Sequence, residues 1–159
     1  PQRYALTRGF RLVDTRTKDS LARWQKHKSP ASDTVGACAL DTEGLLFTAT
    51  STGGLGNEIP GRVSDSAMPA GNYANSFCAV SATGTGEEII EECLAAKIAT
   101  RVLDGLPLEA AFQKTFIEVK RSNRRMAAIG VDRLGNLAWG NSTAQLVYTW
   151  KRGKETGVF

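Results

Sequence analysis

Histidine is almost absent from this sequence. The one histidine among 159 residues, His27, lies in a lysine-rich segment that is typical of a solvated surface. Serine–histidine and cysteine–histidine mechanisms use an imidazole as their base, and this chain offers little material for either. A histidine-rich metal site has equally little support, and we expect no metal or cofactor. Any nucleophile and its base must therefore come from other residue types.

Cysteine is scarce and scattered. The three cysteines, Cys38, Cys78 and Cys93, are odd in number and widely spaced, and no CxxC pair occurs. This pattern fits neither a disulfide framework nor a zinc site. Because each cysteine has apolar neighbours, we expect all three to be small core residues.

Long apolar runs are also missing. No stretch is long enough to cross a membrane, and the start lacks the charged-then-apolar order of a signal peptide. We therefore expect a cytoplasmic protein without a membrane partner.

The net charge of +4 comes from basic residues clustered near the start and around 120–125. These clusters lack interleaved aromatic residues and any nucleic-acid motif, so they predict solvated faces and no nucleic-acid partner. A basic protein that binds an acidic partner remains an alternative.

What the sequence does contain is an alternation of strands and helices that indicates one α+β fold. The first 33 residues predict a helix end at 2–9, a strand at 10–13, a basic helix from 19 or 20 to 28, and an exposed loop at 29–32. The remainder predicts strands at 34–40, 45–50, 77–82, 126–131 and 137–141, and helices at 87–103 and 107–120. The segment 52–75, rich in Gly, Ser, Asn and Pro, predicts a binding loop.

Two of the predicted hairpins share one turn chemistry. An aspartate followed three residues later by glycine occurs at Asp41 and Gly44, and again at Asp132 and Gly135. We interpret these as hairpins of facing or continuous sheets and not as a tandem repeat.

The junction Asp33-Thr34 carries the most specific chemistry. Cutting this bond would leave Thr34 with a hydroxyl and an α-amine on one residue. An α-amine has a pKa of about 7.7–8.0, which suits a general base near neutral pH. Thr34 is therefore a candidate nucleophile that supplies its own base.

Further polar residues follow at the ends of predicted elements. In an antiparallel hairpin, Thr52 returns beside Thr34, where its hydroxyl could assist. Arg62 can hold a carboxylate and Asp65 can accept from an ammonium, which together suit an amino acid. Thr83 and Gly84 stand between a strand and a helix, where an oxyanion could be stabilised.

These motifs occur in a familiar order. Asp33-Thr34-Val35-Gly36, Thr50-Ser51-Thr52-Gly53-Gly54, Gly61-Arg62-Val63-x-Asp65-Ser66 and Ser81-x-Thr83-Gly84-x-Gly86-Glu87 resemble those of the plant-type L-asparaginases and isoaspartyl peptidases. This family is related to glycosylasparaginase and threonine aspartase, which are N-terminal nucleophile hydrolases. The resemblance covers nearly the whole chain and fades after Thr143.

The resemblance implies a role for each residue. Thr34 would be the catalytic nucleophile, released by self-cleavage after Asp33, with Thr52 assisting and with Thr83 and Gly84 forming the oxyanion hole. Arg62, Asp65 and Gly86 would bind the substrate, either asparagine or a β-aspartyl dipeptide. Residues 1–33 would be the tail of an α-subunit-like segment and 34–159 the β-subunit-like catalytic segment. The implied fold is a four-layer αββα sandwich, and a structural Na or K ion can accompany it.

This sequence departs from the family pattern at several positions. Ser64 and Ala67 replace a glycine and a proline, Glu58 stands where lysine is common, and the following loop is shorter. Only 33 residues precede Thr34, whereas the family has a long upstream segment. We therefore expect a partial sandwich, completed by further sequence, by paired α/β subunits or by a second chain. A truncated, catalytically incompetent relative and a non-catalytic binding module remain alternatives.

Overall fold

The computed structural model of the chain describes residues 6–9, 11, 18, 34–54, 61–143 and 146–158. Asp33, the predicted loop at 29–32 and the predicted basic helix at 19–28 lie outside these residues, as does nearly all of the predicted strand at 10–13. Near the start, Gly9 has φ +81° and donates its amide hydrogen to the Leu6 carbonyl oxygen at 3.1 Å. This geometry agrees with a helix end at Gly9.

Two of the catalytic candidates, Thr34 and Thr52, lie on a two-stranded ribbon. Strands β1 (Thr34–Leu40) and β2 (Leu46–Thr52) pair antiparallel with Thr34 opposite Thr52. The first strand matches its prediction, and the second runs two residues further than predicted. Exposure alternates along both strands, so every second side chain points to a single inner face.

The second sheet has four antiparallel strands in the order β3-β4-β5-β6. These are β3 (Asn72–Ala74), β4 (Cys78–Gly84), β5 (Met126–Asp132) and β6 (Leu137–Asn141). The predicted loop 52–75 is thus partly regular, because its described part contains β3 and the short 3-10 helix η1 (Asp65–Ala67).

The two hairpins use the same turn chemistry, as predicted. Asp41 accepts from the amides of Glu43 and Leu45 at 2.9 and 2.8 Å through a single carboxylate oxygen. Asp132 accepts in the same manner from the amides of Leu134 and Asn136, at 2.8 and 2.9 Å. The two ribbons lie in different sheets that face one another.

The prediction of a single helix at 87–103 is wrong, because the helix is interrupted at Cys93. It forms α3 (Gly86–Glu92) and α4 (Leu94–Leu103), and Cys93 between them has φ +49°. The first backbone amides of α4 have hydrogen-bond acceptors outside the helix. The amides of Ala95 and Ala96 donate to the carbonyls of Ala70 and Pro69 at 2.7 and 3.1 Å. Such bonds satisfy donors that an uninterrupted helix would bond internally.

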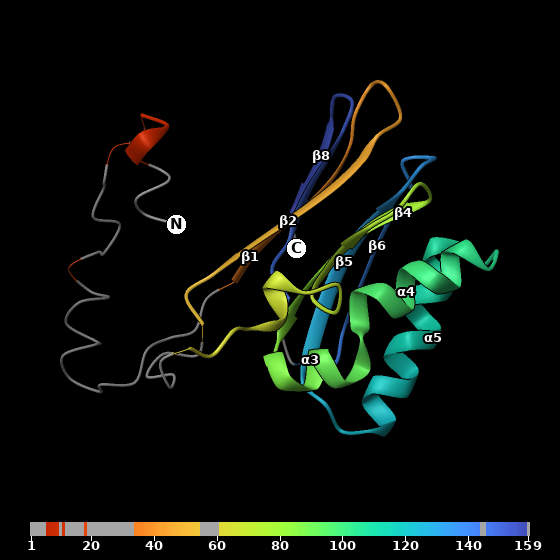
Figure 1. Cartoon of the computed structure of the whole chain (residues 1–159). Helices are drawn as coiled ribbons and strands as arrows, with labels where there is room; N and C mark the ends of the chain where they lie inside the picture. Colours follow the sequence, from red (N-terminus) through yellow and green to blue (C-terminus); the bar gives the residue numbers. More distant parts are fainter. Residues whose placement is uncertain are drawn as a thin grey trace.

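The final helix agrees closely with the sequence pattern. Helix α5 (Leu108–Arg121) starts after Pro107, and the predicted inward residues are all buried: Leu108, Ala111, Phe112, Phe116 and Val119. With Leu94 and Ile98 of α4 they pack against one face of the β3–β6 sheet and form the hydrophobic core. The ribbon β1–β2 lies on the opposite face of this sheet (Figure 1).

The end of the chain adds a hairpin that the sequence analysis did not anticipate. Among the described strands, β7 (Thr149–Arg152) and β8 (Glu155–Val158) pair only with one another. Trp139 of β6 packs against Tyr148, just before β7, with ring centroids 4.8 Å apart.

Among the described helices, none is both long and apolar enough to cross a membrane.

The expectation that all three cysteines lie in the core is wrong for Cys93. Cys78 is fully buried and Cys38 partly so, but Cys93 is exposed at the helix break. Burial raises the pKa of both the Cys38 and Cys78 thiols to about 11. At neutral pH these two thiols are therefore protonated and unreactive.

Candidate active site

Two threonine hydroxyls meet at the open end of the ribbon. The Oγ1 atoms of Thr34 and Thr52 lie 3.2 Å apart, which is hydrogen-bond distance. The Thr52 oxygen also accepts from the amide of Gly54 at 3.0 Å. Because Thr34 and Thr52 are the last pair of the ribbon, the hairpin itself holds the two hydroxyls together.

The inner face of the ribbon approaches the four-stranded sheet very closely. Gly36 faces Ser81 of β4, and a Cβ atom on Gly36 would lie only 2.2 Å from the Ser81 hydroxyl oxygen. That hydroxyl bonds Thr50 of β2 at 2.8 Å, and Thr48 Oγ1 donates to the Val80 carbonyl at 3.2 Å. Polar side chains and a glycine thus fix the ribbon, and with it Thr34, against β4.

A cavity of about 260 Å³ opens beside Thr34. Thr83 of β4 lines the same cavity, together with Ser81 and Gly36. Its far wall comes from residues 146–149, which the sequence analysis did not include in the site. This volume is adequate for a small amino-acid side chain next to the Thr34 hydroxyl.

The turn after Thr83 needs a glycine. Gly84 ends β4 with φ +146°, a conformation that residues with side chains rarely adopt. A Cβ atom there would lie 2.4 Å from the Arg125 carbonyl oxygen and 2.7 Å from the Met126 Cα atom. Two independent constraints therefore require glycine at this position.

Arg62 and Glu87 form an ion pair that the sequence analysis did not predict. Arg62 donates from Nε to Glu87 Oε1 at 2.8 Å, and this hydrogen bond lowers the pKa of the Glu87 carboxyl. Because the pair spans 25 residues, no local spacing rule could have found it. The contact fixes one edge of the guanidinium.

Asp65 is a buried carboxylate with an unsatisfied oxygen. Asp65 is only 5% exposed, and its Oδ2 atom has no hydrogen-bond partner among the described residues. Burial raises the pKa of this carboxyl, and the charge of Arg62 offsets part of the rise. Buried acceptors of this kind normally have a partner, and Oδ2 of Asp65 is free to accept one further hydrogen bond.

Gly86 brings these two charged residues together. A Cβ atom on Gly86 would lie 3.0 Å from both Arg62 Nη2 and Asp65 Oδ1. The first residue of α3 thus lies close to both Arg62 and Asp65. Any larger residue would push at least one of them away.

The predicted site residues therefore form two groups. Thr34, Thr52 and Thr83 gather at the ribbon end and its cavity, whereas Arg62, Asp65 and Gly86 gather around η1 and the start of α3. Gly84 connects the groups through the chain, and η1 packs beside β2. Within the described residues, no group of three acidic, histidine or cysteine side chains is arranged to hold a metal ion.

Comparison with known families identifies the family of this chain. A family model described as "Asparaginase" matches residues 3–159. The chain belongs to the asparaginase family. The match covers almost the whole chain, so the resemblance seen in the motifs is confirmed.

Individual relatives have consistent names. The chain is 52% identical over 124 residues to an "Isoaspartyl peptidase/L-asparaginase" from Nostoc, covering 78% of this chain and 39% of that protein. It is 41% identical over 127 residues to the "Isoaspartyl peptidase" of Escherichia coli, covering 77% and 40%. For the "Plant-type L-asparaginase" of Pyrobaculum calidifontis the identity is 41% over 128 residues, covering 78% and 43%. The chain thus spans about two fifths of the length of these relatives.

Proposed function

We propose that this chain is the catalytic part of a threonine-nucleophile amidohydrolase that acts on β-aspartyl amide bonds. The observation that carries the proposal is the Thr34–Thr52 hydroxyl pair, 3.2 Å apart, beside a cavity that Thr83 also lines. The substrates would be isoaspartyl dipeptides or L-asparagine, in keeping with the names of the relatives.

The reaction would begin with maturation. The Thr34 hydroxyl attacks the Asp33 carbonyl carbon, and the backbone acyl group moves from nitrogen to oxygen. Water then hydrolyses that ester, which leaves the α-amine of Thr34 unblocked. This amine is the base that the sequence otherwise lacks.

In catalysis the α-amine takes the hydroxyl proton, and Thr34 Oγ1 attacks the side-chain carbonyl carbon of the substrate. Thr83 and the Gly84 amide stabilise the oxyanion that forms. The C–N bond then breaks, the proton passes to the leaving ammonia or amine, and a β-aspartyl ester remains on Thr34. Water attacks this ester, aspartate leaves and Thr34 regains its proton. Thr52 holds the Thr34 hydroxyl in line.

Arg62 and Asp65 would hold the substrate at its α-carbon. The guanidinium, fixed at Nε by Glu87, binds the α-carboxylate, and the unsatisfied Oδ2 of Asp65 accepts from the α-ammonium. Gly86 leaves room for both contacts. No cofactor takes part in this scheme, and an alkali cation would have only a structural role.

The fold would be a partial four-layer sandwich. The described residues provide one helical layer, the four-stranded sheet and the two-stranded pairs β1–β2 and β7–β8. The outer face of the ribbon exposes Val35 and Phe47 at 70% and 54%. We infer that a second helical layer, from further sequence or from another subunit, covers this apolar face. The division at residue 34 into an α-subunit-like and a β-subunit-like segment is part of the same proposal.

The decisive experiment uses Thr34→Ala in the protein expressed from its complete coding sequence. We expect the variant neither to split at residues 33–34 nor to release aspartate from isoaspartyl dipeptides or asparagine. Intact mass and an aspartate assay measure the two effects. Thr42→Ala, in the exposed turn of the same ribbon, is the matched control and should behave as wild type. Cleavage at the same bond in Thr34→Ala would refute the proposal, and a wild type that neither splits nor hydrolyses would favour a non-catalytic module.

A further inference from the structure

The turn from β4 into α3 begins at Thr83 and Gly84 and lies against the short basic segment 124–126, which leads into β5. Gly84 pairs with Met126 in the sheet, and the amide of Thr85 donates to the Arg125 carbonyl at 3.0 Å. Gly84 has no room for a side chain because the backbone of residues 125–126 lies directly against it. The position of this turn is therefore coupled to the position of Arg124, Arg125 and Met126.

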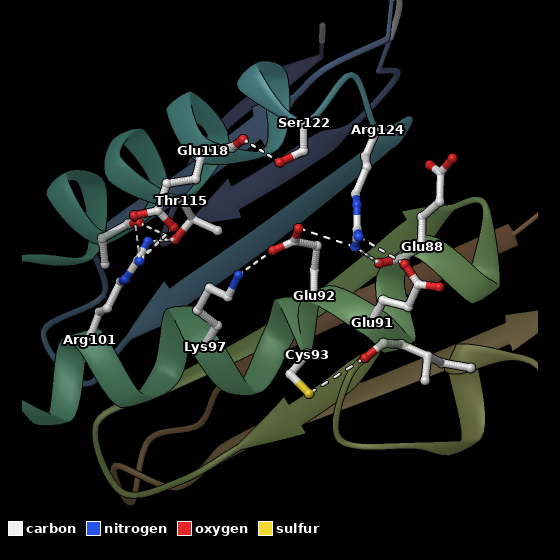
Figure 2. Close-up of polar contacts among 12 residues, drawn as sticks. Glu88, Glu91, Glu92, Cys93, Lys97, Arg101, Thr115, Glu118, Ser122 and Arg124 are labelled. Carbon is white, nitrogen blue, oxygen red and sulfur yellow. Dashed lines mark hydrogen bonds and ion pairs between the residues drawn. The ribbon is translucent and has the colours of Figure 1, made fainter.

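This basic segment is itself fixed to helix α3. The Arg125 amide donates to Glu88 Oε2 at 2.6 Å. The guanidinium of Arg124 donates to the Glu88 carbonyl at 3.3 Å and pairs with Glu91 and Glu92 at 2.8 and 3.1 Å (Figure 2). Arg124 is only 25% exposed and Glu92 13%, so their ion pair is shielded from water more than an ordinary surface pair, whereas Glu91 is 65% exposed.

A second attachment holds the segment from its other side. Ser142, just after β6, donates its hydroxyl to the Arg124 carbonyl at 2.6 Å and accepts from the Met126 amide at 3.0 Å. Residues 124–126 are thus bonded to α3 on one side and to the end of β6 on the other. These hydrogen bonds restrain residues 124–126 on both sides.

From these contacts we infer that Glu88 and Arg124 are positioning residues for the oxyanion hole. They fix residues 124–126 against α3, and residues 125–126 set the location of the Thr83–Gly84 turn. The inference rests on the proposed function, because it assigns Thr83 and Gly84 their role there. Neither residue touches the substrate, so their effect falls on the orientation of the oxyanion donors.

The test compares Arg124→Ala and Glu88→Ala with Arg101→Ala in the complete protein. Arg101 is a matched control: it is 18% exposed, it bonds Thr115 at 2.7 Å and Glu118 at 2.7 Å, and it lies in the same helical layer (Figure 2). We expect Arg124→Ala and Glu88→Ala to lower kcat by about tenfold or more with KM within about twofold, because misplaced donors cost rate and not binding. Arg101→Ala should leave kcat unchanged below its melting temperature.

Glu88→Gln separates positioning from charge. A glutamine keeps an oxygen that can accept from the Arg125 amide, so this variant should recover most of the kcat that Glu88→Ala loses. A Glu88→Gln variant as slow as Glu88→Ala would contradict the role of that hydrogen bond.

Hydrogen exchange gives a readout that does not depend on activity. The Thr85 amide should exchange faster in Arg124→Ala and Glu88→Ala than in Arg101→Ala, because its acceptor is released. If both variants match Arg101→Ala in exchange and in kcat, the inference is wrong. The inference is also wrong if the Thr85 amide exchanges faster in Arg124→Ala and Glu88→Ala while the kcat of both variants stays at the wild-type value. If Thr34→Ala remains active, the proposed function fails, and exchange at Thr85 still decides whether residues 124–126 hold the turn.

Discussion

At the scale of single residues, Asp65 combines a proposed role in substrate binding with a cost in stability. Its carboxylate is buried, and one of its oxygens has no partner among the described residues. An ionised group that loses its hydration in this way destabilises the folded state unless a ligand compensates. The raised pKa of Asp65 records the same conflict.

Asp65→Asn should therefore stabilise the ligand-free protein at neutral pH while weakening substrate binding. The folded-state pKa lies above the unfolded value, so wild-type Asp65 favours folding at low pH and loses that contribution as pH rises through its folded pKa. The melting temperature of Asp65→Asn should exceed that of wild type at pH 7, and the gap should narrow as the pH falls and the wild-type carboxyl is protonated. Thermal unfolding across this pH range measures the gap.

The same variant should raise KM strongly, because a neutral amide cannot replace the carboxylate opposite an ammonium. A KM equal to that of wild type would contradict the proposed role of Asp65 in substrate binding.

At the scale of elements, the ribbon and the four-stranded sheet meet through a contact that tolerates no extra atom. Gly36 and Ser81 are opposed so closely that a methyl group on Gly36 would clash with the serine hydroxyl. Close packing of this kind transmits any added volume into movement of a whole strand. Since Thr34 lies two residues from Gly36, that movement would reach the Thr34 hydroxyl.

Gly36→Ala is expected to destabilise the protein by about 1–3 kcal/mol, the usual range for overpacking. Adding Ser81→Ala removes the nearest clashing atom and should recover part of the loss. Gly53→Ala is the control, since a Cβ atom at Gly53 has no neighbour within 4 Å. Urea unfolding of the four proteins measures the differences, and a Gly36→Ala variant as stable as Gly53→Ala would show that the two sheets separate easily.

Element by element, the sequence predicted what depends on local patterns. The inward stripe of α5 and the paired Asp41 and Asp132 turns follow from periodicity and turn chemistry, and the structure has both. The break at Cys93 could not be foreseen, because its cause is a pair of loop carbonyls more than twenty residues earlier in the chain. The Arg62–Glu87 pair is invisible for the same reason: it depends on how distant segments fold together.

The candidate site was likewise predicted only where it depends on local sequence patterns. Thr34 and Thr52 were predicted to meet because an antiparallel hairpin has a simple geometry, and their hydroxyls do meet. The cavity wall formed by residues 146–149 was missed, since nothing in those residues signals proximity to Thr34.

At the scale of the whole molecule, the outer face of the ribbon is the most telling feature. Val35, Leu45 and Phe47 are each more than half exposed, and all three belong to the ribbon or to the turn that joins its strands. Several large apolar side chains exposed on one ribbon are typical of a contact surface. We expect the complete protein to bury it.

Phe47→Lys should therefore destabilise the complete protein by about 2 kcal/mol, the usual value of one buried large apolar side chain. Leu134→Lys, on the exposed turn between β5 and β6, should change stability by less than about 0.5 kcal/mol, as surface substitutions generally do. Chemical unfolding compares the two variants. Equal effects would indicate that this face stays open to water.

The ribbon register described above has one more consequence. Thr34 and Thr52 are eighteen residues apart, and the Asp41–Gly44 turn helps to set which residue of β2 lies opposite Thr34. One residue inserted into that turn would offset the pairing, so that Ser51 would stand opposite Thr34, or the Thr52 side chain would point to the other face of the ribbon. The length of the turn at the far end of the ribbon therefore influences which side chain lies beside Thr34 Oγ1, and a change of that length would alter the proposed site without replacing any residue in it.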